Sequence, residues 1–127
     1  METVTETIIK EFIAQNRIEL LSTHGKLCLP IINRIYKKMM GGIQFRAIRI
    51  DDRVICDGHH RFIASLFADY PLERTAGKST SATQVITWNQ VSFEEEDWDT
   101  TAKINLLNEQ DAAYNNLSIE RILEMLE

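Results

Sequence analysis

One short segment of the sequence combines residue types suited to binding an anion. Gly58 follows an apolar run and directly precedes His59, His60 and Arg61. If that run is a strand and the residues after Gly58 begin a helix, the first backbone N–H groups of the helix lack intrahelical partners and, with the helix dipole, favour an anion. Glycine also lets a ligand approach the turn closely. Because cationic side chains are unfavourable at this end of a helix, the His-His-Arg run predicts a phosphate site.

The polar side chains of this segment have candidate roles. Arg61 offers a planar fork of donors for phosphate oxygens, and His60 is expected to bind phosphate beside it. His59 would either bind phosphate or act as a general acid. Asp57 would act as a base towards an acceptor hydroxyl or help to hold Mg²⁺, and the alternative is that it only caps the following helix. No other metal is predicted.

Four further charged residues are candidates for the wall of this pocket. Arg46 and Arg49 lie on a predicted strand and would extend a positive groove, with a solvated strand edge as the alternative. Glu73 and Arg74 follow the predicted helix and would line the pocket, with exposed loop residues as the alternative. These four residues would lie at the margin of the phosphate site.

Two other patterns resemble known sites and are set aside. Residues 77–80 read Gly-Lys-Ser-Thr, but the corresponding phosphate-binding loop needs another glycine five residues earlier, and the sequence has leucine there. A flexible loop is predicted instead, with a lid as its candidate role. His24 with Cys28, and Cys56 with His59, lack the spacing of standard zinc sites.

Apolar residues at helical spacing predict helices on both sides of the phosphate segment. The glycines and prolines of the sequence mark where these helices stop and start. The first expected helix runs from Thr3, which has capping-box spacing to Glu6, as far as Gly25. Further helices are expected from Pro30 to Gly41-Gly42, from Gly58 to Pro71, through the acidic stretch after Ser92, and from a cap at Ser118.

Short apolar runs predict the strands. Residues 44–50 and 53–56 would form a hairpin about the Asp51-Asp52 turn, residues 75–83 a loop, and residues 84–88 a third strand. The predicted class is α+β, a small mixed sheet with flanking helices. The chain is expected to be one domain, with a core over 27–90 and helical flanks over 1–25 and 92–127.

The run from Arg53 to Ala64, Arg-Val-Ile-Cys-Asp-Gly-His-His-Arg-Phe-Ile-Ala, resembles the signature of the ParB/sulfiredoxin-like superfamily. In that family a hairpin leads into a Gly-x-x-Arg turn that holds nucleotide phosphates, and an alanine follows in the helix. The resemblance covers about residues 27–88 and implies the family's fold. It also implies that Gly58 and Arg61 bind the phosphates.

The residues of the turn differ from those of some family members, which shows the members that this chain resembles most. ParB proteins carry Gly-Glu-Arg-Arg at the turn, and sulfiredoxins carry a catalytic cysteine directly after the glycine, where this chain has His59. The turn is most similar to the Asp-Gly-His-His-Arg-like turn of free-serine kinases and the Asp-Gly-Gln-His-Arg turn of DNA-modification regulators. Sulfiredoxin activity is therefore not expected.

The resemblance implies ATP or another nucleotide as ligand, with Mg²⁺ and a small-molecule acceptor. The expected activity is phosphoryl transfer, as in a kinase, or nucleotide hydrolysis. One alternative is a metal-dependent nuclease or toxin-like effector of the ParB-like type, since histidine, aspartate and arginine also serve phosphodiester cleavage. The other is a non-catalytic protein-binding module, which the helical ends and acidic patch motivate.

Composition and net charge limit the partners and the location that can be expected. The chain has 127 residues and a formal net charge of -5, which disfavours nucleic acid as the partner because phosphate neutralisation needs a basic face. Hydrophobic residues make up 44%, but no apolar run approaches the ~20 residues of a membrane span. Without a basic leader segment, a cytoplasmic protein with no membrane partner is expected. Cys28 and Cys56 are expected to be reduced and buried.

Overall fold

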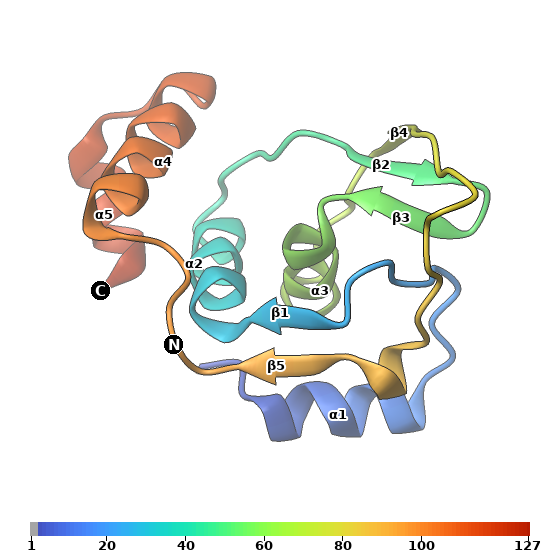
Figure 1. Ribbon diagram of the computed structural model, residues 1–127. Coiled ribbons are helices and arrows are strands. Elements are labelled where there is room, and N and C mark those ends of the chain that lie inside the picture. Colours follow the sequence, from blue (N-terminus) through green and yellow to red (C-terminus); the bar gives the residue numbers. More distant parts are fainter. Residues whose placement is uncertain (1–2) are drawn as a thin grey trace.

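The structure is a computed structural model that describes residues 3–127 and has an α+β architecture. Figure 1 shows short strands that are covered by helices on several sides. The elements in chain order are α1 Glu6–Gln15, β1 Lys26–Cys28, α2 Leu29–Met40, β2 Ile48–Asp51, β3 Val54–Asp57, α3 His59–Ala68, β4 Arg74–Ala76, the 3-10 turn η1 Trp88–Gln90, β5 Ser92–Glu94, α4 Thr101–Tyr114 and α5 Ile119–Leu126.

The strands of the described part form two small sheets. In one, β2 lies between β3, which is antiparallel to it, and β4, which is parallel. In the other, β1 pairs with β5 in parallel. Isolated bridges from Leu21 to Val54 and from Ser22 to Ile86 connect the segment before β1 to strand β3 and to the segment that precedes η1. The three-stranded sheet is therefore mixed, as predicted, whereas β1 and β5 form a second, parallel sheet that the sequence does not predict.

One hydrophobic core joins both sheets to α1, α2 and α3. Val4 and Ile9 from the N-terminal segment, Ile63 from α3 and Phe93 from β5 belong to the same buried cluster. The N-terminal flank and β5 thus complete the core of the central region. A smaller cluster of Ile43, Ala112 and Ile122 attaches α4 and α5 at one side, where Figure 1 shows them as a separate pair of helices beside α2.

The first predicted helix is too long and begins at the wrong residue. Thr5, not Thr3, is the N-cap, because its side chain accepts a hydrogen bond from Ile8 N. The helix ends at Gln15, where the Asn16 side chain binds the carbonyl of Phe12. Leu20 has helical spacing in the sequence but lies in a bend after the helix, where its carbonyl accepts a hydrogen bond from Trp88 Nε1.

The predictions for one strand, one helix start and one loop after α3 are also wrong. The expected strand over 84–88 is a single bridge at Ile86 followed by η1, and the chain after Ser92 begins as β5 and not as a helix. The expected loop over 75–83 begins inside β4. These strands have three residues each, which is too short for an alternating pattern to identify, and they pair with residues far away in the sequence.

Most elements next to the predicted phosphate segment are confirmed, but the strand predicted over 44–50 begins only at Ile48 and the hairpin turn lies one residue later than predicted. The helix α2 begins with Pro30 in its first turn and ends at Gly41, the β2–β3 hairpin turns at residues 52–53, and α3 begins directly after Gly58. Ser118 caps α5, as predicted, by accepting from Arg121 N. Among residues 3–127 no helix combines the length and the apolar character needed to span a bilayer.

Candidate functional site

The turn at Gly58 leaves the start of α3 open. Gly58 is the N-cap of α3 with φ +98° and ψ 30°, a left-handed conformation that suits glycine, and no side chain caps the helix. By contrast, Thr100 caps α4 and Ser118 caps α5. The alternative role of Asp57 as the helix cap is therefore wrong. The first N–H groups of α3 have no side-chain acceptor within residues 3–127 and remain available to an anion.

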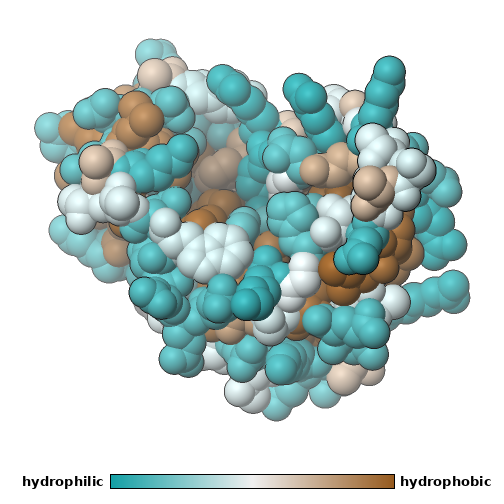
Figure 2. Space-filling model, in the orientation of Figure 1, coloured by the Kyte–Doolittle hydropathy of each residue, from teal (hydrophilic) through white to brown (hydrophobic). Residues whose placement is uncertain are grey.

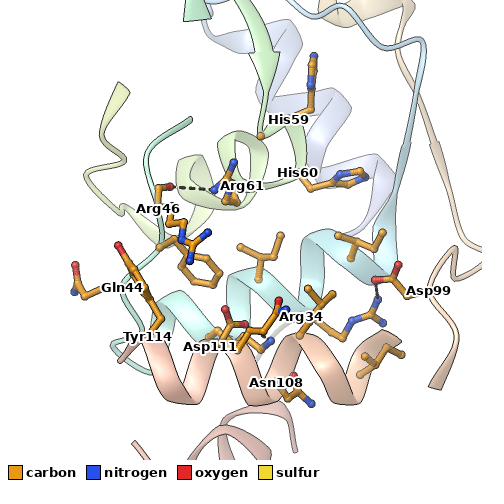
Figure 3. Close-up of a pocket in the computed structure, with 18 of the residues that line it drawn as sticks. Arg34, Gln44, Arg46, His59, His60, Arg61, Asp99, Asn108, Asp111 and Tyr114 are labelled. Carbon is orange, nitrogen blue, oxygen red and sulfur yellow. Dashed lines mark hydrogen bonds and ion pairs between the residues drawn. The ribbon is translucent and has the colours of Figure 1, made fainter. Parts of the chain in front are cut away.

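The Arg61 side chain is held beside this turn. Its Nη1 donates to the carbonyl oxygen of Arg46 at 3.2 Å, and its Nη2 lies 3.3 Å from Asp57 Oδ2 (Figure 3). The Asp57 side chain is 67% exposed, so this ion pair is open to solvent. Arg61 is consequently oriented by a backbone acceptor while its charge is only weakly compensated.

His59 is buried against the segment before β1. Its side chain is 2% exposed, and its Nε2 accepts a hydrogen bond from Thr23 N at 3.0 Å. The ring also stacks on His24 with centroids 4.0 Å apart. Burial, and then the positive charges that His24 and His60 can carry, lower the pKa of His59 to about 3. His59 is therefore neutral near pH 7.

His60 has a similar environment at the end of β1. Its Nε2 accepts from Cys28 N at 3.0 Å, and its ring meets Trp98 edge-on. Burial and the nearby His24 lower the pKa of His60 to about 4, against an opposing effect of Asp99. Both rings are therefore neutral near pH 7. Because Nε2 accepts a hydrogen bond in each ring, each keeps its proton on Nδ1.

A cavity of about 810 Å³ opens at this turn, between α2, α3 and α4. Figure 2 shows it as a hollow between the α4–α5 pair and the rest of the molecule, with hydrophobic residues in its floor. Its volume lies within the range of sites for cofactors and drug-sized ligands. The residues of the turn from Asp57 to Arg61 line it. Apolar side chains also line it, namely Ile31, Ile35, Phe45, Ile104 and Leu107.

No family model, curated protein or solved structure matches this chain. The chemistry of the cavity therefore has to be inferred from the residues that line it.

The charges of the cavity are mostly arranged in pairs. Arg34 forms a bidentate pair with Asp97 and a further bond to Asp99, and Lys38 lies 2.6 Å from Asp111. Arg46 instead stacks over the Tyr114 ring, 5.3 Å from its centroid, and has no carboxylate partner in residues 3–127. Positive charge that is free to meet a ligand is thus concentrated at Arg46 and Arg61, beside the open start of α3 (Figure 3).

The pocket residues predicted from the sequence separate into two groups. Arg46 lines the cavity, but Arg49, Glu73 and Arg74 do not. Arg49 follows the inward-facing Ile48 on β2 and therefore lies on the opposite, exposed side of the strand. Arg74 is directed to Glu19, 3.9 Å away. All three residues are exposed, as the alternatives have it, but Arg49 lies on the central strand β2 and not at a sheet edge, and Arg74 begins β4 and is not a loop residue.

Helices α2 and α4 supply the lining residues that the sequence did not reveal. On α2, Arg34 and Lys38 have i,i+4 spacing, which places both on one face of the helix and was the one available signal. On α4, Asn108, Asp111 and Tyr114 reach the cavity through tertiary packing alone.

The patterns set aside in the sequence form no ligand site in the described part of the chain. Between residues 3 and 127 no group of three or more His, Cys, Asp or Glu side chains is arranged to hold a metal. Cys28 is buried as predicted, but Cys56 is partly exposed. In the Gly-Lys-Ser-Thr segment, Ser79 N donates to the Asp51 carboxylate at 2.9 Å, and bonds from Ser79 lower the pKa of that carboxyl. A carboxylate thus takes the amide that a phosphate would need.

The ion pair of Lys38 is expected to contribute to the stability of the cavity wall. Lys38 is 4% exposed, so replacing Asp111 with alanine leaves a buried ammonium group without its partner. We expect a loss of about 2 kcal/mol in the free energy of unfolding, less than for a fully buried pair because Asp111 is partly exposed. Urea denaturation measures this loss.

The matched control is Glu124→Ala, which breaks the exposed pair with Arg121. We expect this substitution to cost less than about 0.5 kcal/mol. Equal losses for the two variants would contradict a structural role of the buried pair.

Proposed function

We propose that this chain is a nucleotide-binding enzyme of ParB/sulfiredoxin-like type that transfers or hydrolyses the terminal phosphate. The cavity carries the proposal, because its lining combines an open helix start and two arginines with apolar side chains. The order α2, β2–β3 hairpin, glycine turn and α3 also agrees with the order that the resemblance implies.

The two ends of the cavity fit different parts of a nucleotide. The amides at the start of α3, with Arg46 and Arg61, offer donors and positive charge to phosphate oxygens. The side chains of Ile35 and Leu107, on facing helices, offer apolar surface to a base or ribose. Neutral His59 and His60 tie the first turn of α3 to the chain around β1 and so fix the phosphate end.

Asp57 is the candidate for the chemical step. Its exposed carboxylate lies beside Arg61 at the phosphate end of the cavity. Mg²⁺ in nucleotide sites is commonly held by one or two carboxylates together with the phosphates, and a single aspartate satisfies that pattern. Asp57 would hold the ion or accept the proton of an acceptor hydroxyl. Mg²⁺ would neutralise charge on the transferred phosphate.

Binding is tested by isothermal titration with ATP, CTP, GTP and UTP in the presence of Mg²⁺. For the nucleotide that binds, we expect Arg61→Ala to weaken the affinity by ~10- to 100-fold, because charge-assisted hydrogen bonds to phosphate are lost. Arg49→Ala removes an arginine outside the cavity and is expected to bind like the unchanged protein. Absence of binding by the whole panel, or equal losses in both variants, would contradict the proposal.

Turnover is tested separately by release of inorganic phosphate and by transfer of labelled terminal phosphate to small hydroxyl compounds. In this assay Asp57→Asn should abolish turnover and retain most of the nucleotide affinity.

A further inference from the structure

His24 is an exposed histidine of the cavity whose ring has no hydrogen-bond partner within residues 3–127. It lies in the segment before β1 and lines the cavity together with the turn from Asp57 to Arg61. Ser22 takes up its backbone groups, since His24 N donates to Ser22 Oγ at 3.0 Å and Ser22 Oγ donates to the His24 carbonyl at 2.8 Å. The two ring nitrogens are therefore left for a ligand.

His59 holds this ring close to the start of α3. The two imidazoles stack with their centroids 4.0 Å apart and their planes 15° from parallel. His59 is the first residue of α3, and its Nε2 accepts from the backbone N–H of Thr23, the residue before His24. One buried side chain thus anchors the backbone next to His24 and supports its ring. A ring oriented in this way loses less conformational freedom when it binds a ligand.

The three histidines of the chain differ in what their rings can offer. In His59 and in His60, Nε2 is already bound to a backbone N–H. Burial, and next the positive charge that His24 can carry, lower the pKa of each of these two rings. His24 alone combines exposure with two free nitrogens, and an imidazole presents at least one N–H donor whether it is neutral or protonated.

We propose that His24 is a further substrate-binding residue, which donates a hydrogen bond from its ring to a phosphate oxygen of the nucleotide at the start of α3. The inference rests on the proposed nucleotide function. Figure 3 shows Arg46 and Arg61 on one side of this helix start and His59, on which His24 stacks, on the other. Guanidinium groups and an imidazole would thus approach the phosphates from two sides of the open amides.

Affinity is measured by isothermal titration with inorganic tripolyphosphate, ATP, CTP, GTP and UTP, each in EDTA to prevent turnover that depends on Mg²⁺. For each probe that binds, we expect His24→Ala to weaken the affinity by ~10-fold, because one hydrogen bond to a charged group is lost. His24→Gln keeps an N–H donor and should recover part of this affinity. Lys26→Ala removes an exposed cation outside the cavity and, as the matched control, should bind like the unchanged protein.

A second measurement locates the contact at the ring itself. Long-range ¹⁵N–¹H spectra report the ring nitrogens of each histidine, and the signals of His24 are identified by their absence in His24→Gln. Addition of the probe that binds most tightly should shift the ring signals of His24 more than those of His59 and His60, whose Nε2 atoms are bound to the backbone. A residue that only supports the fold would show no such shift.

The outcomes separate this inference from the proposed function. If a nucleotide binds and Arg61→Ala weakens it, but His24→Ala binds like Lys26→Ala or the His24 signals do not shift, the role of His24 is wrong and nucleotide binding stands. If tripolyphosphate binds through His24 and no nucleotide binds, the phosphate contact stands and the nucleotide function is wrong. If no probe binds, with or without Mg²⁺, both are wrong. If His24→Ala lowers the Tm, the ring signals of the unchanged protein decide.

Discussion

Replacing Gly58 with alanine is expected to lower the free energy of unfolding by about 3 to 4 kcal/mol. Two effects add. The backbone has φ +98°, where a residue with a Cβ atom is strained. The new Cβ would also overlap Ile48 Cγ2 and lie 2.8 Å from Arg61 Nη2. Because Ile48 is fully buried, it has little room to move, and urea denaturation at pH 7.5 should record the loss.

Gly42 provides a control that isolates the contact with Ile48. Its φ of +96° nearly equals that of Gly58, but no heavy atom lies within 4 Å of an added Cβ. Gly42→Ala therefore measures backbone strain alone and is expected to cost about 1 to 2 kcal/mol. If Gly58→Ala costs no more than Gly42→Ala, the turn is not closely packed on Ile48.

The Gly58 turn also explains which part of the fold the sequence predicts well. The hairpin and α3 are local structures, so the Asp51-Asp52 turn, the glycine and the apolar spacing lie within about 20 residues. The contact of Gly58 with Ile48 is part of the same unit, because β2 pairs directly with β3. A motif with most of its contacts inside one supersecondary unit can be identified from one sequence.

Long-range pairings explain what the sequence does not predict. Strand β5 exists because Phe93 pairs with Leu27, 66 positions earlier, and its acidic neighbours favour a helix start when considered locally. The wall that α4 gives to the cavity depends on Asp111 reaching Lys38 and on Asn115 exchanging hydrogen bonds with Gln44. None of these partners is adjacent in sequence, so the cavity could not be predicted.

The protonation of a single side chain also cannot be predicted from the sequence when its partners are distant, as the two histidines show. Their position in the first turn of α3 is predicted, but their protonation depends on Thr23 N and Cys28 N, backbone donors more than 30 residues away. An imidazole nitrogen that accepts from a backbone N–H cannot also hold a proton. The sequence therefore predicts that His59 and His60 lie in the first turn of a helix and leaves their charge undetermined.

Acidification from pH 6.5 to 4.5 is expected to destabilise the protein through these two histidines. Their pKa values are lowered to about 3 for His59 and about 4 for His60, while in the unfolded chain each is near 6.5. Above pH 6.5 both rings are neutral in both states, and no stability is lost. As the pH falls below 6.5 the unfolded chain binds protons that the folded protein does not, so the free energy of unfolding decreases until the folded-state pKa values are reached. After allowance for solvent screening we expect a loss of roughly 1 to 2 kcal/mol per histidine at pH 4.5.

The double variant His59→Gln/His60→Gln tests whether these two histidines cause the loss of stability at low pH. A glutamine oxygen can accept the backbone N–H bonds that Nε2 accepts, but the amide does not titrate. Urea denaturation of both proteins at pH 7.5, 6.5, 5.5 and 4.5 should show a decline for the unchanged protein and a much flatter profile for the variant. Carboxylates with lowered pKa values, such as Asp97 bound to Arg34, lose their contribution below this range and do not account for the difference. Equal slopes for the two proteins would mean that both imidazoles are accessible to protons in the folded state, and then they could supply positive charge to a bound phosphate after all.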